Sequence, residues 1–118
     1  MSLSANKEVV RRLFEEVWNQ GEIDVLDEIM AVELIDHRND GSSVPSNRQE
    51  QADIFRERLA GFRDICVTCD ETIAEADKIA LRWTARALNG ETGEELKKLH
   101  ICIYRIEMGR ITEIWTCY

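Results

Sequence analysis

The chain has 118 residues, of which 44% are hydrophobic, so we expect one domain over residues 1–118 with a core of its own. The formal net charge is −8 and no basic run is present, which argues against nucleic-acid binding because such proteins gather Lys and Arg on one face. No apolar stretch reaches the roughly 18 residues of a membrane span, and the N-terminus lacks a signal-peptide pattern. We therefore expect a soluble cytoplasmic protein that binds neither nucleic acid nor membrane.

The first half of the chain has helical periodicity. Apolar residues recur at positions 10, 13, 14, 17 and 18 with charged residues between them, which predicts one amphipathic helix that ends near Gly21. Residues 23–30 predict a second, short helix. After a loop over residues 38–45, Ser46 and Gln49 have the spacing of a capping box, which predicts a third helix that runs to about Gly61.

Beyond Gly61 the pattern changes to the alternation of β-strands. Four strands are predicted over residues 64–74, 78–88, 96–107 and 110–118, and Met108-Gly109 marks the turn between the last two. Helices followed by antiparallel strands predict an α+β fold. A strongly curved sheet that packs on the preceding helices encloses a conical pocket.

The closing hairpin determines which side chains reach this pocket. If its even-numbered residues share one face, that face carries His100, Cys102, Tyr104 and Thr116, a mixture of polar and apolar groups that suits a binding cavity. The odd-numbered positions of the last three strands are far more apolar and predict either the core beneath the helices or a buried dimer surface. They are Ile79, Leu81, Trp83, Leu99, Ile101, Ile103, Ile111 and Trp115.

The cysteines do not predict a metal site. Cys66 and Cys69 have CxxC spacing, but residues three apart on a strand point to opposite faces and no second CxxC completes a ligand set. We expect reduced thiols, no metal and no cofactor, because the chain also lacks a phosphate-binding glycine loop and a GxSxG nucleophile motif.

Four segments in this order resemble the SnoaL-like polyketide cyclases of the nuclear transport factor 2-like superfamily. They are KEVVRRLFEEVWNQGEIDVLDEIM at 7–30, LIDH at 34–37, ALRWTARA at 80–87 and IYRIEMGRITEIW at 103–115. The resemblance implies a cone-shaped α+β fold, with N-terminal helices packed on a strongly curved, mainly antiparallel sheet. It also implies a cavity against the even face of the hairpin, a homodimer formed through the sheet, and a cofactor-free aldol ring closure as in the named enzymes.

The resemblance also indicates where acid–base residues belong. The cyclases use an aspartate just after the tryptophan of the last strand and a histidine on the neighbouring strand, and these places correspond to Thr116 and Cys102. Thr116 cannot act as a base near neutral pH. The candidates that remain for acid–base catalysis are His37 and His100.

Several candidates have a structural alternative. His37 is either a residue at the pocket mouth or a surface-loop histidine. Arg82 either stabilises an enolate or pairs across the sheet with Asp70, Glu71 or Glu113. Glu113 itself is expected to be solvated or to lie in a dimer contact.

Two functions follow from these residues. The first is a cofactor-free lyase, isomerase or cyclase-type enzyme that acts on a small hydrophobic carbonyl compound. The second is a non-catalytic domain that binds a small hydrophobic molecule or forms a dimeric interaction module. The side chains expected to contact a ligand are Trp18, Phe55, Thr84, Cys102, Tyr104 and Thr116.

Overall fold

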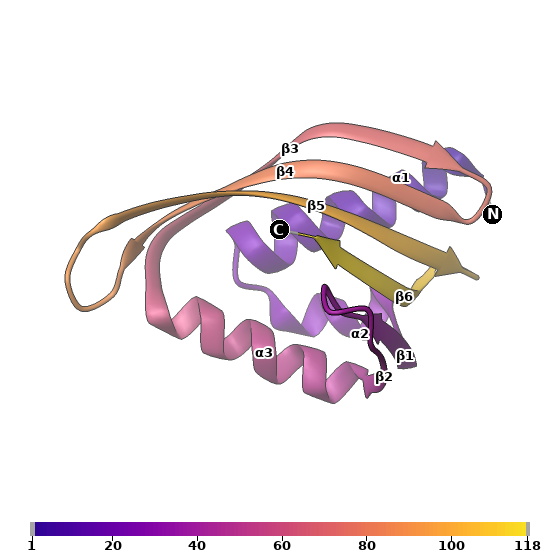
Figure 1. The fold of residues 1–118 in the computed structure, drawn as a ribbon, viewed down its shortest axis with the longest axis horizontal. Coiled ribbons are helices and arrows are strands. Elements are labelled where there is room, and N and C mark those ends of the chain that lie inside the picture. Colours follow the sequence, from indigo (N-terminus) through magenta and orange to yellow (C-terminus); the bar gives the residue numbers. More distant parts are fainter. Residues whose placement is uncertain (1, 118) are drawn as a thin grey trace.

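A computed structural model describes residues 2–117 (Figure 1), and none of the helices in this range is long and apolar enough to cross a membrane. The helices are α1 (Leu3–Arg12), η1 (Leu13–Asn19), η2 (Ile23–Val25), α2 (Leu26–Ile29) and α3 (Arg48–Gly61). The strands are β1 (Met30–His37), β2 (Ser43–Asn47), β3 (Phe62–Glu75), β4 (Lys78–Asn89), β5 (Glu95–Glu107) and β6 (Arg110–Cys117). The fold is α+β, as the sequence predicts.

The strands form one mixed, mainly antiparallel sheet in the order β2-β1-β6-β5-β4-β3. Among the strand pairs of residues 2–117, β1 with β6 is the parallel one. The long strands β3, β4 and β5 bend over the helices, and α1 and α3 lie beneath the concave side (Figure 1). Strands β3 to β6 were predicted from the sequence, whereas β1 and β2 were not. β1 pairs with β6 at the far end of the chain, and β2 is a short edge strand that contains Pro45.

The predicted N-terminal helix has two parts. After α1 the chain continues as the π-helix η1, whose turns are wider than those of an α-helix. Leu13, Phe14 and Val17 in η1 are buried, and Trp18 is half-buried. The widened turn changes the phase of the apolar stripe, and the Trp18 ring lies 4.6 Å from that of Phe55 on α3, measured between ring centroids.

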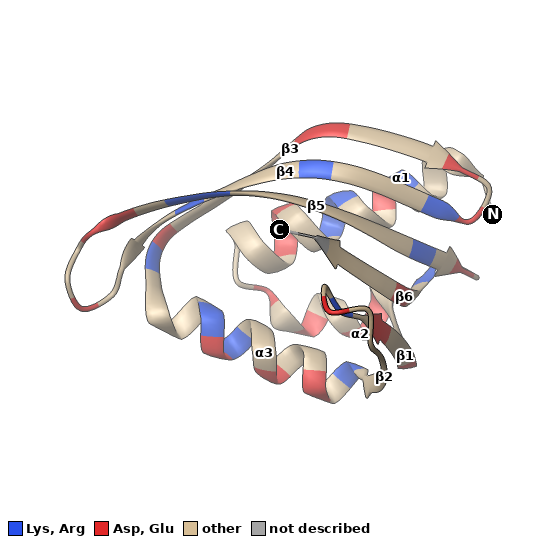
Figure 2. Ribbon diagram, viewed as in Figure 1, with Lys and Arg blue, Asp and Glu red and all other residues tan. Residues whose placement is uncertain are grey.

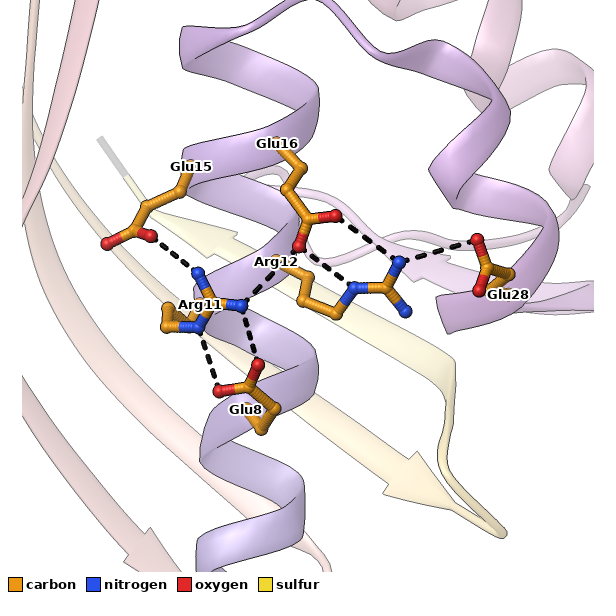
Figure 3. A network of polar contacts seen from close by, with 6 residues as sticks. All are labelled: Glu8, Arg11, Arg12, Glu15, Glu16 and Glu28. Atoms are coloured by element: carbon orange, nitrogen blue, oxygen red, sulfur yellow. Dashed lines mark hydrogen bonds and ion pairs between the residues drawn. The ribbon is translucent and has the colours of Figure 1, made fainter.

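A network of charges joins these helical segments on their outer side (Figure 3). Arg11 contacts Glu8, Glu15 and Glu16, and Arg12 contacts Glu16 as well as Glu28 of α2, with Nη2 3.3 Å from the Glu28 carboxylate. Because most of these groups are solvated, the network orients α2 against η1 more than it adds stability.

The core lies between the helices and the concave face of the sheet. Leu81 of β4 lies opposite Cys102 of β5, and Trp83 lies opposite His100. The concave face therefore combines odd positions of β4 with even positions of β5, and the single odd-numbered face expected across all three strands is wrong. Parity within a strand follows from the pleat, whereas parity between strands depends on register.

The start of α3 also differs from the expectation. Its cap is Asn47, whose Oδ1 accepts a hydrogen bond from the Glu50 backbone N–H at 2.8 Å. Ser46 lies one residue earlier, and its hydroxyl donates to the Glu50 carboxylate. The helix thus begins one residue later than a cap at Ser46 would give.

Candidate functional site

A cavity of about 690 Å³ opens between α3, η1 and the concave face of the sheet. This volume lies within the usual range of small-molecule sites. Its inner wall is largely apolar and aromatic, and includes Leu13, Trp18, Phe55, Val67, Trp83 and Ile114.

Trp83 is the centre of the aromatic wall. Its ring lies 5.2 Å from Phe14 and 6.4 Å from Trp18, measured between ring centroids. The imidazole of His100 stacks on the Trp83 indole, with 4.2 Å between the ring centroids and 20° between the ring planes. These contacts join one helical segment, η1, and two strands, β4 and β5, around one indole, so they give the cavity a fixed flat surface.

His100 is buried in this wall, with 8% of its surface exposed. Burial is the main cause of a lowered pKa for its imidazole, and the positive charges of Lys98 and Arg58 lower the pKa further. The neutral form is therefore the one held in the cavity near neutral pH. A neutral imidazole is able to accept a proton from a bound molecule.

Cys102 lies two residues after His100 on the same face of β5. Its Sγ accepts a hydrogen bond from the indole Nε1 of Trp83 at 3.2 Å. Burial raises the pKa of its thiol, and hydrogen bonds from Tyr104 and Trp83 oppose that rise only in part. The thiol form is thus favoured, which makes Cys102 a poor nucleophile. Thr116 is its cross-strand partner on the concave face.

Most of the predicted ligand contacts lie in the cavity wall. Trp18, Phe55, Cys102, Tyr104 and Thr116 all line it. The hairpin positions among them belong to the even-numbered face. The two residues that correspond to the cyclase acid–base positions, 102 and 116, face each other across β5 and β6.

The expectation that Arg82 and Thr84 reach the ligand is wrong, because both residues lie on the opposite, convex face of the sheet. Thr84 donates its hydroxyl to the Asp70 carboxylate at 2.6 Å, and Arg82 pairs with Asp70 and Glu71 at 4.0 and 3.6 Å. The register of β4 on β5 sets Arg82 opposite Ile101 and Thr84 opposite Leu99, on the side away from the cavity. Arg82 therefore has the cross-sheet pairing that was its structural alternative.

His37 lies at the rim, but its ring is engaged on the convex side. It stacks on Trp115 at 4.5 Å, its Nδ1 contacts the Ser43 hydroxyl, and its Nε2 lies 2.7 Å from the Glu113 carboxylate. Glu113 also binds Arg105. The hydrogen bond with His37 is the main cause of a lowered pKa for Glu113. The Glu113 side chain is 15% exposed, so the alternative of a solvated side chain is wrong.

The rim of the cavity carries charges that the sequence did not reveal. Arg38, Arg58, Arg86 and Lys98 line it, and Asp36 is the single acidic residue among the described lining residues. The four cations come from a loop, a helix and two strands. No local pattern connects them, so only the fold brings them together.

Helices beneath one side of a bent, six-stranded mixed sheet define a nuclear transport factor 2-like fold. The chain belongs to the SnoaL-like polyketide cyclase family, whose sequence model matches residues 8–118. This confirms the resemblance seen in the sequence. Among curated proteins, no sequence matches the chain.

Solved structures share this fold. A proposed polyketide cyclase from Acidithiobacillus ferrooxidans superposes with a TM-score of 0.85 and 23% identity, over 99% of this chain and 90% of its own. IdmH from Streptomyces antibioticus, also a proposed polyketide cyclase, gives a TM-score of 0.82 and 22% identity, over 95% and 90%. A nuclear transport factor 2-like protein of unknown function from Burkholderia pseudomallei gives 0.79 and 18%, over 100% and 92%.

Proposed function

We propose that this SnoaL-like protein binds a small hydrophobic carbonyl compound in the cavity and acts on it as a cofactor-free acid–base enzyme of lyase, isomerase or cyclase type. His100 is the proposed acid–base residue. The observation that carries the proposal is the buried imidazole of His100, stacked on Trp83 in the cavity wall with a lowered pKa. His37 and Arg82 have no part in it, because their polar groups are engaged on the convex side.

The chemistry follows from a neutral imidazole beside an apolar surface. His100 removes a proton from the carbon next to a carbonyl group, which leaves an enolate and an imidazolium. Thr116, whose side chain also lines the cavity, would donate its hydroxyl to the enolate oxygen. In a ring closure the enolate carbon attacks a second carbonyl of the same molecule, and the imidazolium returns its proton to the new alkoxide.

Membership of the SnoaL-like family supports the reaction type, and two similar structures are proposed polyketide cyclases. The residues of this chain differ from the cyclase pattern, because Thr116 and Cys102 stand at the expected acid–base positions. In our proposal His100, two residues before Cys102 on the same face of β5, takes over the proton transfer.

Deuterium exchange tests the proposal without knowledge of the natural substrate. With 2-tetralone as a probe in D₂O, NMR measures the rate at which the hydrogens next to the carbonyl are replaced. We expect His100→Gln to lower the protein-catalysed rate about 10²-fold or more. His37→Gln is the matched control and should leave the rate unchanged. An exchange rate that His100→Gln does not alter would refute the catalytic role.

A non-catalytic binding domain is the second candidate. It is favoured by the absence of a carboxylate at Thr116 and by the thiol form of Cys102, which leave two cyclase positions without an acid–base group. The same experiment separates the candidates. Shifts of the indole NMR signals on addition of 2-tetralone, without deuterium exchange above the buffer rate, would establish binding alone.

We also propose that two copies of the chain associate through the convex face of the sheet. Ile73, Leu99 and Ile101 are 64%, 61% and 54% exposed there, and such a cluster of exposed apolar side chains is typical of an interface. Sedimentation velocity should show a dimer that Ile101→Lys dissociates. Met108→Lys, at the exposed β5–β6 turn, is the control. A wild-type monomer at all concentrations would exclude this association.

A further inference from the structure

We infer that the ligand of the cavity carries an anionic group, which the cations of the rim bind while the aromatic wall holds a flat apolar body. The inference rests on the proposed function in one respect, namely that the cavity is a ligand site. It adds the chemical class of that ligand, an aromatic or similarly flat carboxylate.

The first observation is the sign of the charge around the cavity. The chain as a whole is acidic, with 23 Asp and Glu against 15 Lys and Arg. The lining reverses this balance, since Arg38, Arg58, Arg86 and Lys98 face one acidic residue, Asp36. Figure 2 shows basic segments of α3 and of β4 and β5 near their hairpin at the same end of the molecule.

The second observation is that these cations lack ion-pair partners within the described residues. Arg12, Arg48, Arg82 and Arg105 all pair with carboxylates elsewhere in the fold. None of the four cations of the rim lies within 4.0 Å of a carboxylate oxygen among residues 2–117. Arg38 does act on the nearby Asp40 carboxylate through its charge. In a protein with this excess of acids, Arg58, Arg86 and Lys98 around one opening are available to bind an anion from solution.

The third observation is that the positive field reaches the inner wall. Lys98 and Arg58 add to the effect of burial in lowering the pKa of His100. A bound anion beside these two residues would offset their charge. The pKa of His100 should therefore rise when the ligand binds, so the pKa of this buried imidazole reports whether an anion is bound at the rim.

The size and composition of the cavity specify the rest of the ligand. Its 690 Å³ admits a molecule of two or three fused rings, and the indole of Trp83 together with Phe55 offers flat contact surface. The body would thus stack on the aromatic wall. Its carboxylate would point outward to the guanidinium groups, which bind such groups through paired hydrogen bonds.

Two probes that differ only in charge test the inference. Naphthalene-2-carboxylate and naphthalene-2-carboxamide have the same ring system, and titration calorimetry measures the affinity of each. We expect the carboxylate to bind about tenfold more tightly or better, with an advantage that shrinks as salt is added. The double variant Arg58→Gln/Lys98→Gln should remove most of this advantage and leave the affinity of the amide unchanged.

Neighbouring cations supply a matched control. Arg56→Gln/Lys97→Gln removes the same charge from the same helix and strand, at positions that do not line the cavity. It should retain the preference for the carboxylate. In the wild type, NMR titration should also show a higher pKa of His100 with the carboxylate bound.

The outcomes separate this inference from the proposed function. Equal affinities for the two probes, or equal losses in both double variants, would overturn the anionic ligand while the cavity remained a binding site. Failure of both probes to shift the signals of the cavity indoles would count against the binding site itself, and so against the proposed function.

Discussion

Trp83→Phe is the sharpest test of how the cavity wall is built. The indole is 8% exposed, contacts rings on two other elements and donates a hydrogen bond to Cys102. Phenylalanine keeps the six-membered ring but gives up roughly 50 Å² of buried apolar surface, which corresponds to about 1 kcal/mol. Loss of the bond from Nε1 to the sulfur adds about 0.5 kcal/mol, a small value because a thiol is a weak acceptor.

The free energy of unfolding should therefore fall by about 1.5 kcal/mol, and the melting temperature by about 6 °C. Urea denaturation followed by circular dichroism measures the first quantity, at fixed protein concentration because an association would add to stability. Trp115→Phe is the control, since that ring stacks on His37 on the convex side. A loss below about 0.5 kcal/mol for Trp83→Phe would refute the central role given to this indole.

Three further predictions concern stability. The pKa of His100 is lowered in the folded chain, so below about pH 6.5 the unfolded chain binds a proton that the folded chain does not bind. The free energy of unfolding should therefore decrease as the pH falls below that value. In urea titrations at several pH values, His100→Gln should remove this dependence. The pKa of Glu113 is lowered mainly by its hydrogen bond with His37. Its contribution to the free energy of unfolding is present above about pH 4.3 and is lost as the pH falls through the pKa of the folded chain. Glu113→Gln should therefore weaken the loss of stability at acid pH in the same titration. Asn19 exchanges two hydrogen bonds with the Val67 backbone, at 2.9 and 2.6 Å, so thermal unfolding of Asn19→Ala should show a loss of about 1–3 kcal/mol, and an unchanged melting temperature would show that water replaces both bonds.

Local patterns sufficed for much of the fold. The predicted strands over residues 64–74, 78–88, 96–107 and 110–118 correspond to β3, β4, β5 and β6 with ends that differ by at most two residues; the end predicted at 118 lies outside the described residues. Each of them covers at least eight residues, and the turns that follow β4 and β5 have their own sequence patterns. The turn at Met108-Gly109 is an example, because both residues have positive φ, 52° and 78°.

Features that depend on distant partners were not predictable. The pleat assigned Cys102, Tyr104 and Thr116 to one face correctly, but it gave no register between β4 and β5, and Arg82 and Thr84 were therefore placed on the wrong face. The π-helix at η1 is likewise a response to packing that local periodicity does not encode.

The two histidines show how the sheet divides the chemistry of this protein. On the convex face the charged neighbour of His37 is a carboxylate, that of Glu113. On the concave face the charges near His100 are those of Lys98 and Arg58, which oppose an imidazolium. A base must nevertheless become an imidazolium once it has taken a proton. An anion bound between Lys98 and Arg58 would remove that opposition at the moment the substrate is in place, so an anionic substrate would supply part of the charge that its own deprotonation requires.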